Sequence, residues 1–206
     1  MHERIVGLYE DNAAAWDRQR GRDLFEKAWL DRFLGLLPPG PSVLDIGCGM
    51  GEPIARYLIE RGARVTGLDS SPSLIALARE RFPEHEWLVA DMRALDLGRR
   101  FDGVLAWHSF FHLSPEDQEP MFPRFAAHAR RGAALMFTSG WDRGDAIGRW
   151  QGEPLYHGSL ATAEYQSLLE MNGLVVVDHR VSDPECGHAT IWLAQMSPAS
   201  GLDGSA

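Results

Sequence analysis

The sequence predicts an α/β fold: a doubly wound sheet of seven mostly parallel strands, with an antiparallel last strand and a helical N-terminal lid. Short apolar and β-branched runs alternate with helix-like stretches from residue 42 onward, which is the pattern of right-handed βαβ crossovers. Pro38-Pro39-Gly40-Pro41 ends any helix before this alternation begins. Residues 182–188 join the last two expected strands and are too few for a crossover helix, so these strands should be antiparallel to each other.

Local signals mark where the expected elements start and end. Ser71-Pro72 and Ser114-Pro115 each pair a capping hydroxyl with a proline in the first helical turn. Gly62 stands where a helix-ending glycine is expected. The expected strands cover residues 42–46, 64–68, 86–90, 103–107, 133–138, 174–181 and 189–195, and the expected helices between them cover residues 53–61, 72–81, 115–130 and 161–172.

The chain is expected to form a single domain over residues 1–206, because this length suits one hydrophobic core. Residues 5–37 have a helical pattern with a break near Gly21, and residues 1–39 are predicted to form the lid. The core is predicted to span residues 40–196. Residues 197–206 are small and polar and are predicted to form a flexible tail.

Composition and charge narrow the function classes. The chain has a formal net charge of −9, which argues against a nucleic-acid partner, since such proteins usually carry a basic stripe. No apolar run reaches about 18 residues, so a membrane span is not expected, and no signal peptide is recognisable. Two cysteines are too few for a disulfide framework and indicate a reducing cytoplasm. We expect a cytoplasmic monomer or homodimer.

The stretch VLDIGCGMG at residues 43–51 predicts a turn that holds a ligand close to the backbone. A phosphate-binding P-loop needs a lysine after its last glycine, but the only lysine of the chain is Lys27. A dinucleotide fingerprint needs Gly or Ala where Glu52 stands. Asp45 and Glu52 would repel a pyrophosphate and suit a ligand with an ammonium and a sulfonium group. Alternatively, Asp45 orients the turn by accepting hydrogen bonds from backbone amides.

The glycine turn and three later motifs resemble the class I S-adenosylmethionine-dependent methyltransferase family, over about residues 40–196. VLDIGCGMG resembles the first motif of that family, and GLDSS places Asp69 at the end of the second strand. VADMRAL places Asp91 and Met92 at the end of the third strand, and FDGVLAWHSFFHL places Trp107 at the end of the fourth. The resemblance implies a Rossmann-like fold that binds S-adenosyl-L-methionine and releases S-adenosyl-L-homocysteine.

The family pattern also implies a role for each motif residue. An acidic side chain at Asp69 can accept hydrogen bonds from both ribose hydroxyls, and the Asp91 position binds the adenine edge. The N-terminal segment resembles the lid helix of small-molecule members, where Arg20 would pair with the methionine carboxylate. The residues expected to bind the cofactor are Asp45, Gly47, Cys48, Gly49, Gly51, Asp69, Ser70, Asp91, Met92, Trp107, Trp16 and Arg20. The alternative roles are helix caps for the two later aspartates, core packing for Met92 and Trp107, and a plain packing helix for the lid.

Methyl transfer is an in-line displacement in which positioning dominates, and a base is needed only for a weak nucleophile. His108 is the first candidate for a base or hydrogen-bond donor facing the substrate. It stands in Ala106-Trp107-His108-Ser109, where enzymes that methylate nucleobase amino groups carry an Asn/Asp-Pro-Pro-aromatic signature instead. His112 matches a family position that usually packs near the sheet. These two histidines have no evident third partner, so no metal site is expected.

Residues 140–160 form an aromatic-rich segment, which we expect to be a loop between the fifth strand and the next helix. Large aromatic side chains on a loop need something to cover. The segment would either roof a substrate pocket or seal a core against the N-terminal helices. The residues expected to contact the substrate are His112, Trp141, Trp150, Tyr156 and His157.

The combined pattern predicts a methyltransferase that acts on an oxygen or nitrogen of a small molecule. No large insertion offers a docking domain for a macromolecule. The alternatives are a non-catalytic S-adenosylmethionine-binding protein, a protein or RNA methyltransferase, and a nicotinamide-dependent oxidoreductase. The last would need affinity for a pyrophosphate.

Overall fold

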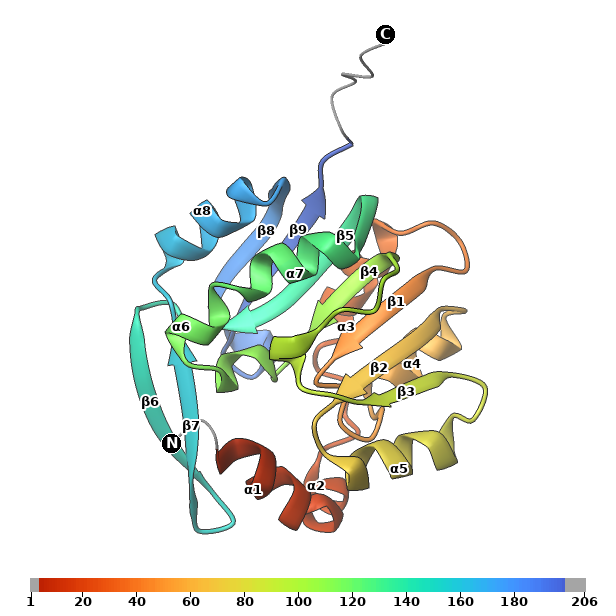
Figure 1. Cartoon of the computed structure of the whole chain (residues 1–206), viewed down its shortest axis with the longest axis vertical. Helices are drawn as coiled ribbons and strands as arrows, with labels where there is room; N and C mark the ends of the chain where they lie inside the picture. The colour runs from red at the N-terminus through yellow and green to blue at the C-terminus, as the bar shows by residue number, and fades with distance from the viewer. Residues whose placement is uncertain (1–3, 199–206) are drawn as a thin grey trace, which may run out of the picture.

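The computed structural model describes residues 4–198, so residues 199–206 of the predicted tail lie outside the described residues. A seven-stranded sheet in the order β3-β2-β1-β4-β5-β9-β8 forms the centre of the molecule (Figure 1). Its strands pair in parallel except for β9, which is antiparallel to both β5 and β8. The predicted α/β fold, with a mostly parallel sheet and an antiparallel last strand, is therefore confirmed.

The bounds of the elements follow the predicted alternation closely. The sheet contains β1 (Ser42–Ile46), β2 (Arg64–Asp69), β3 (Glu86–Val89), β4 (Phe101–Ala106), β5 (Ala129–Ser139), β8 (Leu174–Asp183) and β9 (Ala189–Met196). The α-helices are α1 (Ile5–Asp11), α2 (Ala13–Gln19), α3 (Lys27–Gly35), α4 (Ile54–Glu60), α5 (Pro72–Arg81), α6 (Pro115–Gln118), α7 (Met121–His128) and α8 (Thr162–Met171). Short 3₁₀ turns are η2 (Met92–Ala94), η3 (Phe110–His112) and η4 (Pro184–Cys186).

Helices cover both faces of the sheet, because successive strand residues point to opposite sides. On one face, α3, α4 and α5 pack against apolar residues such as Val43 and Leu105. On the other face, α7 and α8 pack against residues such as Leu44 and Val104. Both faces are therefore apolar, and polar side chains are displaced to the ends of the strands.

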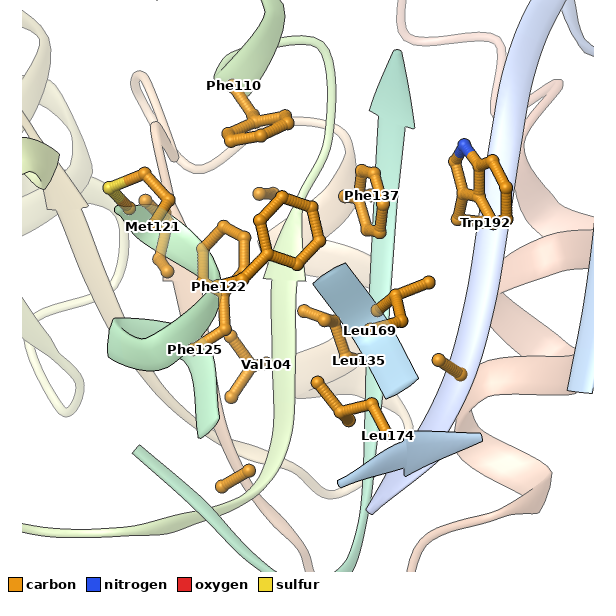
Figure 2. Packing of buried hydrophobic residues seen from close by; sticks show 14 of the residues in the cluster. Val104, Phe110, Met121, Phe122, Phe125, Leu135, Phe137, Leu169, Leu174 and Trp192 are labelled. Atoms are coloured by element: carbon orange, nitrogen blue, oxygen red, sulfur yellow. The ribbon is translucent and has the colours of Figure 1, made fainter. Parts of the chain in front are cut away.

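The second of these cores is built around aromatic rings (Figure 2). Phe110, from η3, contacts Phe122 and Phe125 of α7 at ring-centroid distances of 5.9 and 5.7 Å. It also meets Phe137 of β5 at 5.5 Å, and Phe137 stacks on Trp192 of β9. This cluster fixes η3, and so anchors the chain that leaves β4 toward the ends of the parallel strands.

The N-terminal segment predicted as one lid divides into two parts. The helices α1 and α2 lie below the lower end of the sheet in Figure 1, beside the carboxyl ends of β1 and β2. In contrast, α3 buries Trp29, Leu30 and Phe33 against the sheet and belongs to the core. Only α1 and α2 are therefore in a position to act as a lid, so the predicted range 1–39 was too long.

The helix predicted over residues 115–130 is two helices, and the prediction of one helix was wrong. Ser114 caps α6 by accepting a hydrogen bond from the backbone N–H of Asp117, as its sequence signal indicates. Pro120 cannot donate an N–H to a continuing helix, so α6 ends and α7 begins after it. Strand β5 then starts at Ala129, four residues before its predicted start at residue 133, because Ala129 pairs with Phe101 of β4.

The segment 140–160, predicted as a loop, contains a β-hairpin. Strands β6 (Gly144–Trp150) and β7 (Glu153–Ser159) pair antiparallel and form a separate two-stranded sheet. The turn consists of Gln151 and Gly152, whose φ angles of 53° and 81° match a primed two-residue hairpin turn. The hairpin projects beside α1 in Figure 1 and contacts it.

Candidate functional site

Two adjoining cavities lie at the carboxyl ends of the parallel strands, where ligands of doubly wound sheets bind. The larger, of about 850 Å³ and open to solvent, runs from the glycine turn toward the ends of β2 and β3. The smaller, of about 420 Å³, lies between α2 and the end of β4. The cavities share the lining residues Trp16, Gly47, Gly49 and His108 and so form one cleft.

The glycine turn after β1 brings backbone rather than side chains to the cleft. Gly47, Gly49 and Gly51 have φ angles of 75°, 55° and 79°, a region that favours glycine. A Cβ at Gly47 would lie 2.2 Å from Cβ of Ser109. The turn is fixed to the neighbouring strand, since the N–H of Gly47 donates to the carbonyl of Leu68 over 2.6 Å.

Asp45 presents a buried carboxyl group beside this turn. Its side chain is 3% exposed and lines the smaller cavity. Burial and the nearby Asp69 raise its pKa to about 7. Within residues 4–198 its carboxyl makes no hydrogen bond or ion pair, so the alternative that it orients the turn through amides is not what the structure shows. A cation in the cavity would stabilise the ionised form.

Glu52, unlike Asp45, does not have an unpaired carboxyl group. The expectation that it serves a cationic ligand beside Asp45 was therefore wrong. It lines the same cavity but pairs with Arg22 at 2.9 Å and with Arg56. Arg81 approaches the same carboxylate to 3.7 Å. These arginines already neutralise Glu52, and they connect the start of α4 to the segment after α2.

Asp69 ends β2 with its carboxylate at the larger cavity. One carboxylate oxygen accepts a hydrogen bond from the N–H of Gly49 over 2.9 Å, and the other accepts one from the N–H of Ser71 over 2.9 Å. Burial raises the pKa of Asp69. Ser70 lines the cavity next to it. The carboxylate thus joins the glycine turn to the end of β2 and keeps acceptor capacity toward the cavity.

Asp91 and Met92 follow β3 and line the far end of the larger cavity. Arg93 donates to the Asp91 carboxylate over 2.6 Å and lowers its pKa. Asp91 also accepts from the backbone N–H of Arg93, which makes it the cap of η2. The capping role and a position at the cavity are therefore both present in one residue.

The smaller cavity collects the remaining residues of the predicted cofactor site: Trp16, Arg20, Cys48 and Trp107. Arg20 donates to Oε1 of the fully buried Glu26 over 2.8 Å, so its charge already has one partner. The buried Nε1 of Trp107 has no hydrogen-bond partner within residues 4–198. Burial raises the pKa of the Cys48 thiol, which makes it a poor nucleophile.

His108 lies where the two cavities meet. Its backbone has a φ of 50°, and its N–H donates to Oγ1 of Thr138 over 2.9 Å. Burial, followed by the charge of Arg20, lowers the pKa of the imidazole to about 4. The ring is therefore neutral near pH 7 and able to accept a proton at the junction of the cleft.

His112 links the N-terminal helices to the hairpin. Its Nδ1 lies 2.8 Å from the carbonyl oxygen of Tyr156, which can only accept, so Nδ1 carries the hydrogen. Its Nε2 then accepts from the hydroxyl of Tyr9 over 3.1 Å. Burial lowers its pKa to about 4, which keeps this tautomer neutral. His112 thus joins α1 to β7 and also lines the larger cavity.

The hairpin packs some of its predicted residues against side chains that line the cleft, but not all of them. The ring of Trp150 stacks on Tyr9 at 5.3 Å, and His157 stacks on His112 at 5.2 Å. Tyr156 is buried and donates its hydroxyl to Asp145 over 2.5 Å, so its carbonyl is what meets His112. None of the predicted residues of segment 140–160 lines a cavity, but Trp141 is also 51% exposed and has no ring contact with the described residues, so the structure places it away from the cleft.

The structure adds residues that the sequence did not single out. Tyr9 and Ser109 line the larger cavity. Glu10 accepts hydrogen bonds from the hydroxyls of Ser71 and Ser73 and so fastens α1 to the start of α5. Tyr9 and Trp16 lie on different helices, α1 and α2, and meet at a ring-centroid distance of 5.2 Å, so no single helical periodicity marked Tyr9 in the sequence.

Two kinds of site are not found in the described part of the chain. Residues 4–198 contain no group of three or more His, Cys, Asp or Glu side chains arranged to hold a metal ion. No helix among the same residues has the length and apolar character needed to cross a bilayer.

Comparison with known sequences gives matches to methyltransferases. Residues 43–132 match a family described as a methyltransferase domain. The chain is 34% identical over 106 residues to the dTDP-3-amino-3,6-dideoxy-alpha-D-glucopyranose N,N-dimethyltransferase of Streptomyces fradiae, covering 50% of this chain and 41% of that protein. It is 34% identical over 116 residues to the trans-aconitate 2-methyltransferase of Azoarcus sp., covering 55% of this chain and 42% of that protein. The chain thus spans less than half of the length of these relatives.

Comparison with solved structures extends the fold over nearly the whole chain. An amino pentose methyltransferase from Micromonospora echinaspora, CalS10, solved with bound S-adenosylmethionine, superposes with a TM-score of 0.71 at 19% identity, covering 90% of this chain and 95% of that chain. The 1,6-didemethyltoxoflavin-N1-methyltransferase of Burkholderia thailandensis superposes with a TM-score of 0.70 at 23% identity, covering 95% and 87% respectively. These likenesses show a shared fold.

Proposed function

We propose that the chain is a class I S-adenosylmethionine-dependent methyltransferase that transfers a methyl group from S-adenosyl-L-methionine to a small molecule; the match of residues 43–132 to a methyltransferase domain supports this. The observation that carries this proposal is the unpaired, buried carboxyl group of Asp45 beside the positive-φ glycine turn. Such a site favours a cationic ligand and disfavours a pyrophosphate. The acceptor atom is an oxygen or a nitrogen.

The residues of the cleft fit the three parts of this cofactor. Asp45 and the free Nε1 of Trp107 would face the amino-acid end, together with Trp16 and the Arg20–Glu26 pair. Asp69 would accept hydrogen bonds from the ribose hydroxyls, and Met92 would pack against the adenine. When bound, the cofactor supplies an electrophilic methyl group on a sulfonium, while the chain supplies position and exclusion of water.

Small acceptors are favoured over macromolecules by the cover of the cleft. The helices α1 and α2 and the β6–β7 hairpin close around its mouth, and Trp150 meets both Tyr9 and Trp16. The net charge of −9 also disfavours RNA as acceptor.

Cys48 and Cys186 are both free, which supports a cytoplasmic location.

We propose His108 as the group that accepts the proton of the acceptor. Replacing it with Gln should lower turnover, followed as S-adenosylhomocysteine release from a panel of small metabolites, by about 100-fold or more. Because protonation removes the lone pair, the wild-type rate should fall only as pH drops through the pKa of about 4. His188→Gln is the matched control, since His188 also has a positive φ but lies in the loop before β9. Full turnover by His108→Gln would exclude this role.

Closure of the lid should depend on Glu10. Its carboxylate accepts hydrogen bonds from the N–H of Ser73 over 3.1 Å and from the Ser73 hydroxyl over 2.6 Å. Replacing Glu10 with Ala should weaken S-adenosylmethionine binding about threefold to tenfold, because these partly exposed bonds hold α1 over the cleft. Calorimetry of the variant and of Glu84→Ala, a change remote from the cleft on the loop before β3, checks this. Unchanged affinity in Glu10→Ala would show that α1 stays in place without it.

A further inference from the structure

Eight rings form a continuous shell beside the cleft, and five of them line its cavities: Tyr9, Trp16, Trp107, His108 and His112. Neighbouring centroids are 4.8 to 5.8 Å apart throughout. The ring shell contains Tyr9 and Trp16 from the lid, Trp150 and His157 from the hairpin, and Trp107, His108, Phe111 and His112 after β4. All of them except Trp107 are only half-buried, so ring surface is left for a ligand.

The side chains of the ring shell carry no negative charge. It contributes three imidazoles and no carboxylate, and burial lowers the pKa of His108, His112 and His157, so these rings are neutral. The guanidinium of Arg20, which is itself paired with Glu26, also lowers the pKa of His108. An acceptor that arrived as an ammonium ion would find no carboxylate among the eight rings and would lie beside the cofactor sulfonium, because Asp45 and Asp69 belong to the cofactor side of the cleft. A neutral or weakly acidic acceptor meets no such cost.

We infer that the acceptor is a flat, π-rich compound that offers a weakly acidic O–H or N–H group, as a phenol or a nitrogen heterocycle does, rather than an aliphatic amine. This inference rests on the proposed methyltransferase function and concerns the choice of acceptor. Offset-stacked and edge-on contacts with Tyr9, Trp16 and His112, which line the larger cavity, would hold the plane of such a compound.

The movement of protons in the transfer step fits this class of acceptor. The acceptor O–H or N–H gives its proton to the neutral imidazole of His108 while its oxygen or nitrogen bonds to the methyl carbon. The carbon–sulfur bond breaks with its electron pair left on sulfur, and the imidazolium later returns its proton to water. A weak base of this kind acts best on an acidic group, so an aliphatic alcohol is also disfavoured.

The test measures binding to the full chain saturated with S-adenosylhomocysteine, using 4-nitrophenol and cyclohexylamine as probes in calorimetry. We expect 4-nitrophenol to bind at least about tenfold more tightly than cyclohexylamine. Trp150→Ala should weaken 4-nitrophenol binding about threefold to tenfold, since Trp150 packs against Tyr9 and Trp16 and holds these two cavity-lining rings in place. Trp141→Ala is the matched control and should leave it unchanged, because Trp141 lies outside the ring shell.

Each other outcome has a defined meaning. Tighter binding of cyclohexylamine, or no binding of 4-nitrophenol, would overturn the inference while leaving the proposed function intact. Equal losses in Trp150→Ala and Trp141→Ala would also overturn it, because the ring shell would then not be the binding surface. Failure of S-adenosylhomocysteine itself to bind, measured first, would instead contradict the proposed function.

Discussion

Replacing Asp69 with Asn is expected to weaken S-adenosylmethionine binding by roughly 30- to 150-fold, or about 2–3 kcal/mol, the range for hydrogen bonds to a charged group. The carboxylate already accepts hydrogen bonds from Gly49 and Ser71, and it faces the larger cavity. An amide would have to direct its NH₂ group either at a backbone N–H or at the ribose hydroxyls, and both contacts would lose an acceptor.

Thermal unfolding without ligand separates affinity from folding in this variant. Burial raises the pKa of Asp69, so the neutral amide avoids the cost of a buried charge but leaves one backbone N–H without its acceptor, and the melting temperature of the ligand-free protein should fall by no more than a few degrees. Asp91→Asn is the matched control, because Asp91 is neutralised by Arg93 and should lose less than about tenfold in affinity. Wild-type affinity in Asp69→Asn, or an equal loss in both variants, would contradict the assignment of Asp69 to the ribose.

The second large effect is expected at Gly47. A Cβ there would lie 2.2 Å from Cβ and 2.7 Å from Oγ of Ser109, on a residue with a φ of 75°. Ser109 cannot easily move away, because it is buried and donates to the carbonyl of Ile46 over 2.6 Å. Overpacking and backbone strain each cost about 1–3 kcal/mol, so Gly47→Ala should lower the free energy of unfolding by roughly 3–5 kcal/mol.

Two further variants identify the cause of this loss in urea unfolding. Gly49→Ala should cost only about 1–2 kcal/mol, because its φ of 55° is strained but its added Cβ would have its nearest neighbour, Nε1 of Trp16, 3.7 Å away. Adding Ser109→Gly to Gly47→Ala should recover about half of the lost stability, since the clashing atoms are removed. If Ser109→Gly restores no stability, the clash with Ser109 is not the cause of the loss in Gly47→Ala.

Much of the cleft could be predicted because its residues are tied to strand ends. Asp45, Asp69 and Trp107 each lie at or just after the end of a parallel strand, and parallel strands end at one edge of the sheet. Strand periodicity therefore placed them together without any knowledge of their contacts. The same reasoning found the antiparallel β9 from the short connection before it.

The parts that escaped prediction depend on contacts between distant segments. The pairing of Tyr9 with His112 joins residues 103 positions apart, and no local pattern encodes it. Strand β6 is mostly exposed and β7 is mostly not, so the hairpin has no alternating apolar pattern by which a strand is recognised. Whether a tryptophan in this segment packs against the lid, as Trp150 does, or faces solvent, as Trp141 does, is decided only by the folded hairpin.

The most direct test of the central claim, that this cleft holds a cationic sulfonium cofactor, is calorimetric titration of the full chain with S-adenosylmethionine and, separately, with NAD. The unpaired Asp45 and the absence of a phosphate-binding lysine after the glycine turn predict saturable 1:1 binding of S-adenosylmethionine and no heat from NAD. Binding of NAD without binding of S-adenosylmethionine would contradict the account.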